Sequence, residues 1–233
     1  MNFESRQQID RHVEAGETCC DPEWEAAYKR FETPEEEIEK FTRRLRRFGL
    51  HRQPKNIRIA ELFCGRGGGL VALQRLGLTN VVGVDLSESL LQEYRGVAKL
   101  HLADCRKLPF EDHSFDAAIV QGGLHHLPRL PEDLDAVLSE ASRVLKPTGA
   151  FYVVEPWRTP FLRFVHAVVE QPLIRQVYKK GDALAEMTEH ERQTYEQWLG
   201  QPSDILSVFA RHFDVQEQTT AWGKLRFVGT PIT

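Results

Sequence analysis

The chain has 233 residues, of which 41% are hydrophobic and 27% charged, and its formal net charge is -4. This length fits one α/β domain with additional segments, and the hydrophobic share is enough for a full core. The acidic balance gives no overall positive field that would attract nucleic acid. The amino terminus, MNFESRQQID, is polar, and no apolar run approaches the roughly 20 residues that span a bilayer. We therefore expect a cytoplasmic protein without a membrane span.

The four cysteines do not form a recognisable framework. Cys19 and Cys20 are adjacent, while Cys64 and Cys105 fall inside predicted core elements. No disulfide pattern or CxxC zinc pair is present, and the spacing of His12 to the adjacent pair matches no established ligand set. We expect reduced thiols and no bound metal.

Residues 1–50 are predicted to be a polar, helical extension ahead of the main domain. The segment TPEE at 33–36 is typical of a helix start, with Thr33 as N-cap and Pro34 in the first helical position. Apolar residues then recur at helical spacing, and Gly49 is expected to end the helix. The arginines at 43, 44, 46 and 47 could form a nucleic-acid patch, but we interpret them as a solvated helix end.

From residue 57 onward, short apolar segments alternate with helical ones. Strands are predicted near 57–63, 80–85, 98–102, 115–120 and 148–154. Helices are predicted over 67–77, 87–94, a short piece after Leu108, and 131–145. This alternation is typical of a parallel sheet with helices on both faces. Residues 157–200 are expected to form a helix-rich insertion, and 213–218 with 224–228 a closing hairpin.

Acidic residues follow the predicted strands at the edge where parallel sheets bind ligands. Glu61 precedes the glycine-rich stretch of IAELFCGRGGGL, in which Leu70 stands where a dinucleotide fingerprint needs its third glycine. Asp85 could accept hydrogen bonds from both hydroxyls of a ribose, with a turn or cap aspartate as the alternative. Asp104 could accept from the exocyclic amine of adenine. Three acids disfavour a pyrophosphate and favour a cofactor with adenosine at one end and positive charge at the other, as in S-adenosylmethionine.

Five motifs between residues 57 and 154 resemble the class I S-adenosylmethionine-dependent methyltransferases. They are ELFCGRG, VVGVDLS, ADCRKLPFEDHSFDAAIV, QGGLHHL and SEASRVLKPTGAFYVVEP. The resemblance is to the small-molecule "type 11" branch, which includes ubiquinone and menaquinone methyltransferases. It implies a Rossmann-like α/β fold with a seven-stranded sheet whose last strand is antiparallel. It also implies S-adenosylmethionine as cofactor, with S-adenosylhomocysteine as product.

The resemblance further implies which residues contact the cofactor's methionine end. Glu61, Gly65 and Gly67 would hold the methionine group, and Gln121 would lie beside the methyl-bearing sulfur. Phe63 occupies the position of the family's first glycine, so the chain is expected to be slightly displaced there.

The adenosine end would be held by residues after the second and third predicted strands. By the same resemblance, Asp85 and Leu86 would contact the ribose, and Asp104 and Cys105 the adenine.

Methyl transfer from a sulfonium is an in-line displacement, so the enzyme mainly positions the reactants and needs a base only where the acceptor must lose a proton. His125 and His126 follow the fourth predicted strand, where the acceptor should approach. One of them could be that base, and a packed, hydrogen-bonded support is the alternative. Glu155 and His166 are further candidates.

The sequence disfavours DNA methyltransferases and short-chain dehydrogenases. The form L-F-x-G-x-G-G is similar to DNA cytosine methyltransferases, but residues 121–123 (QGG) replace their Pro-Cys, and also the (Asp/Asn)-Pro-Pro-aromatic segment of amino-methylating DNA enzymes. No tyrosine has a lysine four residues later, which argues against a short-chain dehydrogenase. We expect a small-molecule acceptor and no DNA. The alternatives are a non-catalytic S-adenosylmethionine sensor and a methyltransferase acting on RNA or protein.

The domain organisation predicted is an extension at 1–50 and a methyltransferase domain at 51–233 with the insertion at 157–200. Both flanking segments are expected to close over the acceptor as a lid. Each carries aromatic residues that could line an apolar pocket: Trp24, Tyr28 and Phe31 in one, and Trp157, Phe161 and Phe164 in the other.

Overall fold

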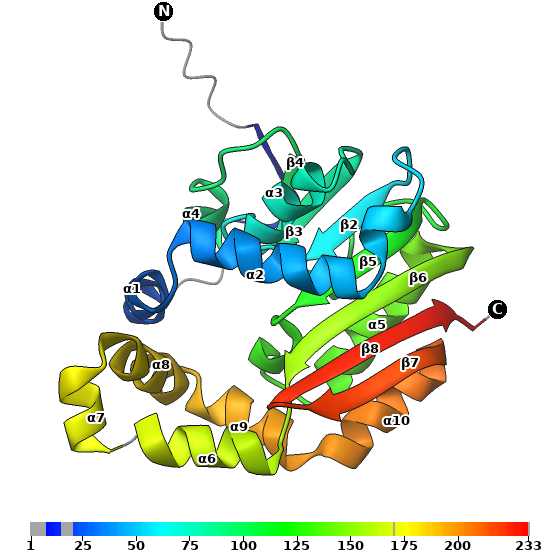
Figure 1. Ribbon diagram of the computed structural model, residues 1–233. Coiled ribbons are helices and arrows are strands. Elements are labelled where there is room, and N and C mark those ends of the chain that lie inside the picture. Colours follow the sequence, from blue (N-terminus) through cyan, green and yellow to red (C-terminus); the bar gives the residue numbers. More distant parts are fainter. Residues whose placement is uncertain (1–7, 15–20, 170, 233) are drawn as a thin grey trace, which may run out of the picture.

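The computed structural model describes residues 8–14, 21–169 and 171–232 (Figure 1). The strands are β1 (Ile9–Arg11), β2 (Ile59–Leu62), β3 (Val81–Asp85), β4 (Lys99–Leu102), β5 (Phe115–Gln121), β6 (Leu145–Pro156), β7 (Phe213–Ala221) and β8 (Lys224–Pro231). The first five helices are α1 (Pro22–Phe31), α2 (Pro34–Arg47), α3 (Gly68–Arg75), α4 (Glu88–Leu91) and α5 (Glu132–Val144). The others are α6 (Pro160–Val169), α7 (Pro172–Val177), α8 (Lys179–His190), α9 (Arg192–Gly200) and α10 (Pro202–His212). Two short 3-10 turns are η1 (Leu50–Arg52) and η2 (Leu124–His126).

The described strands form one sheet of eight, in the order β1-β4-β3-β2-β5-β6-β8-β7. The strands from β1 to β6 pair in parallel, while β8 is antiparallel to both of its neighbours. The predicted Rossmann-like sheet with an antiparallel last strand is therefore confirmed. The additional edge strand β1 was not predicted, because three residues are too few to show a strand period and their pairing with β4 is a tertiary contact.

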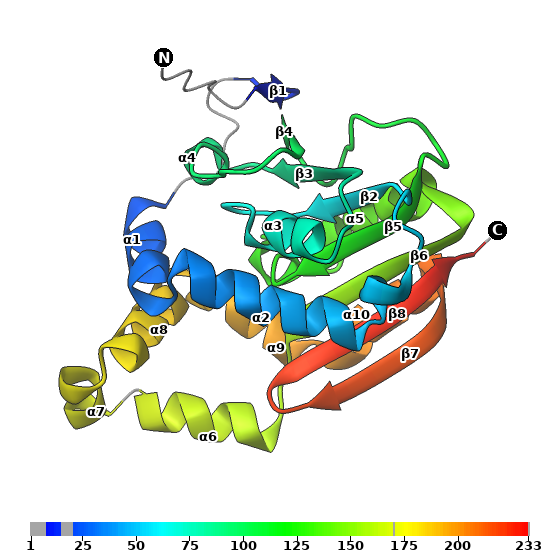
Figure 2. The same ribbon diagram turned by 45° about the horizontal axis from the view of Figure 1, so that its top comes forward.

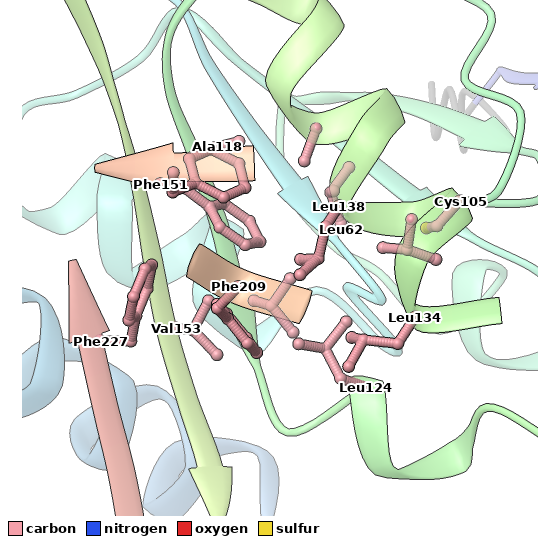
Figure 3. Packing of buried hydrophobic residues seen from close by; sticks show 14 of the residues in the cluster. Leu62, Cys105, Ala118, Leu124, Leu134, Leu138, Phe151, Val153, Phe209 and Phe227 are labelled. Carbon is pink, nitrogen blue, oxygen red and sulfur yellow. The ribbon is translucent and has the colours of Figure 1, made fainter. Parts of the chain in front are cut away.

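Helices cover both faces of the sheet (Figure 2), and an apolar layer lies on each face. Figure 3 shows the first, in which Phe151, Val153 and Phe227 of the sheet pack with residues of α5 and α10 such as Leu138 and Phe209. The second layer joins the opposite face to α2 and α3. A two-sided core of this kind is what the near-continuous apolar runs of the parallel strands require.

Helix α2 begins as predicted. The Thr33 side chain accepts a hydrogen bond from the Glu36 backbone and the Glu36 side chain accepts from the Thr33 backbone, which is a complete capping box. The helix ends at Arg47, and Gly49 takes a left-handed φ of 77°. Within the described residues, no helix is long and apolar enough to cross a membrane.

The predicted short helix after Leu108 is wrong, since residues 108–114 form turns and bends. Side chains satisfy the backbone groups there: Arg143 donates to the carbonyl oxygens of Leu108 and Phe110, and Glu140 accepts from the Leu108 amide. A segment held in this way needs no helical hydrogen bonds of its own. Helix α4 is also shorter than the predicted 87–94, and β6 begins three residues before the predicted 148.

Candidate active site

The glycine-rich loop joins β2 to α3 through three residues with left-handed backbone. Their φ angles are 55° at Phe63, 53° at Gly65 and 80° at Gly67. Phe63 thus takes a conformation that favours glycine, which explains the family preference at this position. Its side chain is accommodated because Gly123 faces it: a Cβ on Gly123 would lie less than 3.0 Å from Phe63.

Glu61 and Gln121 form a buried polar pair at the carboxyl ends of β2 and β5. Their exposed fractions are 2% and 9%, and the Gln121 amide donates to Glu61 Oε1 at 3.1 Å. Glu61 Oε2 and Gln121 Oε1 have no hydrogen-bond partner among the described residues. Desolvation raises the pKa of Glu61 to about 8. Two unsatisfied acceptors side by side are costly unless a donor reaches them, and a cationic ligand would supply it.

Asp85, at the end of β3, shapes the neighbouring loops. One carboxylate oxygen accepts from the Gly65 amide at 2.7 Å and the other from the Ser87 amide at 2.8 Å. Asp85 therefore stabilises the neighbouring turns, which was the predicted alternative to ribose binding. A carboxylate has about four acceptor positions, so acceptor capacity remains for a ribose. Desolvation raises its pKa despite the three backbone hydrogen bonds that oppose it. The adjacent Leu86 is partly exposed.

Asp104 and Cys105 follow the end of β4. Asp104 is bound to the Arg106 guanidinium at 2.6 Å, and Arg106 also reaches Asp133 at 3.0 Å. Part of the acceptor capacity of Asp104 is therefore engaged by an arginine two residues away. Cys105 is 3% exposed, and burial raises the pKa of its thiol, so it is inert packing beside the loop. Cys19 and Cys20 lie outside the described residues.

The turn after β5 is organised by Glu155, which is fully buried at the end of β6. One of its oxygens accepts from the amides of Gly123 and Leu124, both at 2.8 Å. The other lies 2.7 Å from His125 Nδ1. A carboxylate can only accept, so Nδ1 carries the proton and Nε2 is left as an acceptor. Burial lowers the pKa of His125, but Glu155 more than offsets this and the pKa is raised.

His126 and Glu191 complete a cluster with His125 that the sequence did not predict. His126 Nδ1 lies 3.2 Å from Glu191 Oε2, and His125 Nε2 lies 3.9 Å from the same atom. The Trp24 indole also donates to it at 3.0 Å. Burial and His125 depress the pKa of His126, while desolvation raises that of Glu191. The three ligand atoms lie within 4.8 Å of one another, so the cluster could hold either a shared proton or a metal ion.

Arg66, in the glycine-rich loop, is bound by residues of the extension. Its side chain is 5% exposed, donates to Glu37 at 2.6 Å and to the Glu32 carbonyl at 2.7 Å, and stacks over Tyr28. The Tyr28 hydroxyl donates to the same Glu37. This buried network anchors the loop to α1 and α2. No local pattern could reveal it, because its members are about 30 residues apart.

Helix α1 spans the two halves of this edge (Figure 2). On the side of β3, Glu25 accepts from the hydroxyls of Ser87 at 2.9 Å and Ser89 at 2.7 Å. On the other side, the Trp24 ring meets the His126 ring edge-on at 5.4 Å. Both α1 residues, Trp24 and Glu25, belong to the predicted extension. Of the two, Trp24 was expected to lie near the acceptor.

The aromatic residues predicted in the insertion are not gathered with Trp24 and Tyr28. Trp157 is 6% exposed and packs edge-on against Trp198 in the core. Phe161 and Phe164 are 43% and 66% exposed. Besides Glu191, the insertion brings Tyr195 to this cluster, with its ring 5.8 Å from that of His125 and its hydroxyl 3.3 Å from His166 Nε2.

The chain is similar to methyltransferases in sequence. Residues 60–153 match the model of a methyltransferase domain family. Over 114 residues the chain is 32% identical to a sterol 4-C-methyltransferase of Caenorhabditis elegans, which covers 45% of this chain and 33% of that protein. Over 110 residues it is 34% identical to a demethylmenaquinone methyltransferase of Staphylococcus aureus, covering 43% of this chain and 44% of that protein. The match therefore spans less than half the length of each relative.

Solved structures agree on the fold. A protein of Pyrococcus horikoshii aligns with a TM-score of 0.68 at 21% identity, over 91% of this chain and 100% of that one. A putative S-adenosylmethionine-dependent methyltransferase of Methanococcus maripaludis aligns with a TM-score of 0.62 at 15% identity, over 94% and 98%. Residues 60–153 therefore match a methyltransferase domain, and the solved structures share the fold of the chain, in agreement with the resemblance to S-adenosylmethionine-dependent methyltransferases and with the cofactor that its motifs predicted.

Proposed function

We propose that this protein transfers the methyl group of S-adenosylmethionine to a small-molecule acceptor. The observation that carries the proposal is the pair of buried acceptors, Glu61 Oε2 and Gln121 Oε1, left without a donor at the cofactor edge. The cofactor supplies an activated methyl group on a cationic sulfur, together with an ammonium group. Glu61 would bind the ammonium group and Gln121 would lie beside the sulfonium, while Gly65 and Gly67 bring the backbone close to the methionine group.

The adenosine end would be bound at the ends of β3 and β4. The free acceptor positions of Asp85 would take the ribose hydroxyls, with Leu86 against the sugar. Asp104 and Cys105 would contact the adenine, with Arg106 holding the Asp104 carboxylate in place.

His125 would act as the general base for an acceptor that must lose a proton. Glu155 holds its Nδ1–H at 2.7 Å, which leaves Nε2 to take the proton, and Glu191 beyond Nε2 would stabilise the imidazolium that forms. His126, whose pKa is depressed, would stay neutral and bind Glu191. The cluster would work without a metal ion, so turnover should be unchanged after treatment with EDTA.

The acceptor would be enclosed by the extension at 1–50 and the insertion. Ion pairs join α1 to α8: Arg30 binds Asp182 and Glu186, and His190 lies 3.4 Å from both Asp21 and Glu23. An open hollow of about 290 Å³ lies between these segments, and most of its wall is charged, with Glu36, Arg43 and Lys180 beside Phe31 and Tyr178. Sterol and demethylmenaquinone, which the relatives' names give as acceptors, support a small-molecule acceptor.

The first test of this function is cofactor binding. Glu61→Gln keeps the shape of the side chain but removes the charge, and should weaken binding of S-adenosylhomocysteine at least tenfold, since a charge-assisted hydrogen bond contributes about 1.5–3 kcal/mol. Glu39→Gln, on the exposed face of α2, is the matched control. Titration calorimetry measures both. Equal affinities for Glu61→Gln and the wild type would refute the assignment of Glu61.

Transfer itself is tested by incubating the protein with S-adenosylmethionine labelled in its methyl group and a metabolite extract. A labelled small molecule is the expected product. Label in RNA or protein would show a macromolecular acceptor, and tight cofactor binding with no transfer would favour the sensor function.

A further inference from the structure

Helix α2 and strand β8 bring three cationic side chains to one place: Lys40, Arg44 and Lys224. Lys40 is bound to Glu32. The Arg44 side chain contacts the Phe41 ring on its own helix, at 5.4 Å, but neither this side chain nor that of Lys224 forms an ion pair or a hydrogen bond with another described residue. Two cations without acidic partners, held by separate elements, have no evident role in stabilising the fold.

The register of α2 on β8 explains how the two unpaired cations meet. The Arg226 guanidinium lies over the Phe48 ring at 5.0 Å, and Phe48 meets Tyr152 of β6 at 5.2 Å. Lys224 precedes Arg226 by two residues and so shares its face of the strand. Arg44 precedes Phe48 by about one helical turn.

The spacing along the two elements agrees with this placement. Four helical residues advance about 6 Å and two strand residues about 6.6 Å. Helix α2 and strand β8 run in the same direction (Figure 1). Because Phe48 lies beside Arg226, the residues one step earlier on each element, Arg44 and Lys224, also lie beside each other. In the ladder, Lys224 is paired with Pro156, the residue after Glu155. The cations therefore lie next to the carboxyl end of β6, where Glu155 holds His125.

The electrostatics agree with this geometry. Burial lowers the pKa of Lys224 to about 7, and the charges of Arg44 and Lys40 lower it further than Glu32 can restore. Burial also lowers the pKa of Arg44 to about 10, against the charges of Glu32 and Glu155. Lys224 nevertheless remains accessible to water. An exposed lysine that feels the charge of a second cation presents positive charge that an anion can reach.

We infer that Arg44 and Lys224 bind an anionic group, a carboxylate or a phosphate, on the methyl acceptor. The inference rests on the proposed function and narrows its substrate class to acids. The Arg44 guanidinium would bind two oxygens of the anion, and the Lys224 ammonium would bind it from another side. Lys40, one helical turn before Arg44, would add positive charge. Anchoring the acid there would direct the rest of the acceptor past Glu155 toward His125 and the methyl group.

Anion binding can be tested without turnover. Inorganic phosphate and acetate are titrated separately into the complex with S-adenosylhomocysteine, and heat is measured for the wild type, Arg44→Gln/Lys224→Gln, and the control Arg46→Gln on the exposed face of α2. We expect one of the anions to bind the wild type and Arg46→Gln alike, and the double variant at least tenfold more weakly. Which anion binds distinguishes a phosphate-bearing from a carboxylate-bearing acceptor. Equal binding by all three proteins, or by none, would overturn the inference.

The acceptor test separates this inference from the proposed function. Labelled products from the metabolite extract are passed over an anion exchanger at pH 8. Anionic products, formed at least tenfold more slowly by the double variant and restored in part by Arg44→Lys, support the site. Neutral products formed equally fast by the double variant would overturn the site while leaving methyl transfer established. The affinity for S-adenosylhomocysteine should be unchanged in every variant, and this measurement serves as the control that each variant is folded.

Discussion

The two halves of the candidate active site are built by different means. At the cofactor edge, residues 59–105 place Glu61, Asp85 and the glycine loop through backbone hydrogen bonds between neighbouring strands and the bond from the Gly65 amide to Asp85. At the acceptor edge, the side chains that meet come from α1, α2, η2 and the start of α9. These elements are far apart in the sequence: Trp24 and Glu191, which are hydrogen-bonded, are 167 residues apart. A local motif can therefore specify the first half, whereas the second depends on how distant helices pack.

The largest expected effect tests the acceptor half. His125→Gln should lower kcat by about 10²–10⁴-fold without changing S-adenosylhomocysteine affinity, because a general base touches only the acceptor.

Glu155→Gln should shift the pH dependence of kcat to lower pH. Glu155 raises the pKa of His125, and only the neutral imidazole acts as a base, so activity in the variant should rise from a lower pH. The pH dependence of kcat measures this. An unshifted profile in a folded Glu155→Gln protein contradicts the role of the pair.

A substitution at Gly67 should disturb the cofactor half most directly. A Cβ there would lie less than 3.0 Å from the Tyr94 ring, with φ at 80°. Gly77 has a similar φ of 82° but an open environment, in which the nearest atom would be 3.5 Å away. Gly67→Ala should lose about 2–5 kcal/mol of unfolding free energy, and Gly77→Ala about 1–2 kcal/mol, because only the first adds overpacking to backbone strain.

Urea unfolding of both glycine variants provides the measurement. Equal losses would mean that the Tyr94 ring moves aside freely, and that the loop is less rigid than its hydrogen bonds indicate.

A third prediction concerns the pH dependence of stability in the absence of cofactor. The folded pKa of Glu61 is raised to about 8 from its ordinary 4.5, so the unfolded chain releases this proton first as the pH rises. Glu61 therefore stabilises the fold most below pH 4.5, and this contribution is lost as the pH rises to about 8. Glu61→Gln should be more stable than the wild type at pH 9 by roughly 2–4 kcal/mol.

The difference between the two proteins should vanish near pH 4, where both side chains are neutral. Urea unfolding at the two pH values measures it, with S-adenosylhomocysteine absent. A variant that is less stable at pH 9 would show that the Glu61 carboxyl is solvated in the free protein.

The smallest expected effect lies where α1 meets α8. Arg30 is half exposed and pairs with Asp182 and Glu186, so Arg30→Gln should cost less than about 1 kcal/mol of global stability. It should still speed hydrogen exchange in α1, because these pairs hold one flank to the other. Exchange in β2 and β3 should not change. If the sheet opened together with α1, the two halves would be one cooperative unit and the comparison would not hold.

The sequence by itself determined the elements that repeat a local physical pattern. The strands β2 to β5, the helix start at Thr33 and the antiparallel closing hairpin follow from periodicity, capping and turn residues, each decided by neighbours within a few positions. Four of the five methyltransferase motifs lie in or directly after the strands β2 to β5, which is why a resemblance to a family could point to Glu61, Gln121 and the glycines of the loop.

Only the tertiary structure decided which charged groups face one another. Glu155 as partner of His125, Glu191 beside both histidines, and Arg44 beside Lys224 all depend on the packing of segments far apart in the chain. A charged side chain looks the same in sequence whether it is solvated or buried, since its partner is supplied by distant residues. The segment after Leu108 failed as a predicted helix for the same reason, because Arg143 and Glu140 bind its backbone from another element.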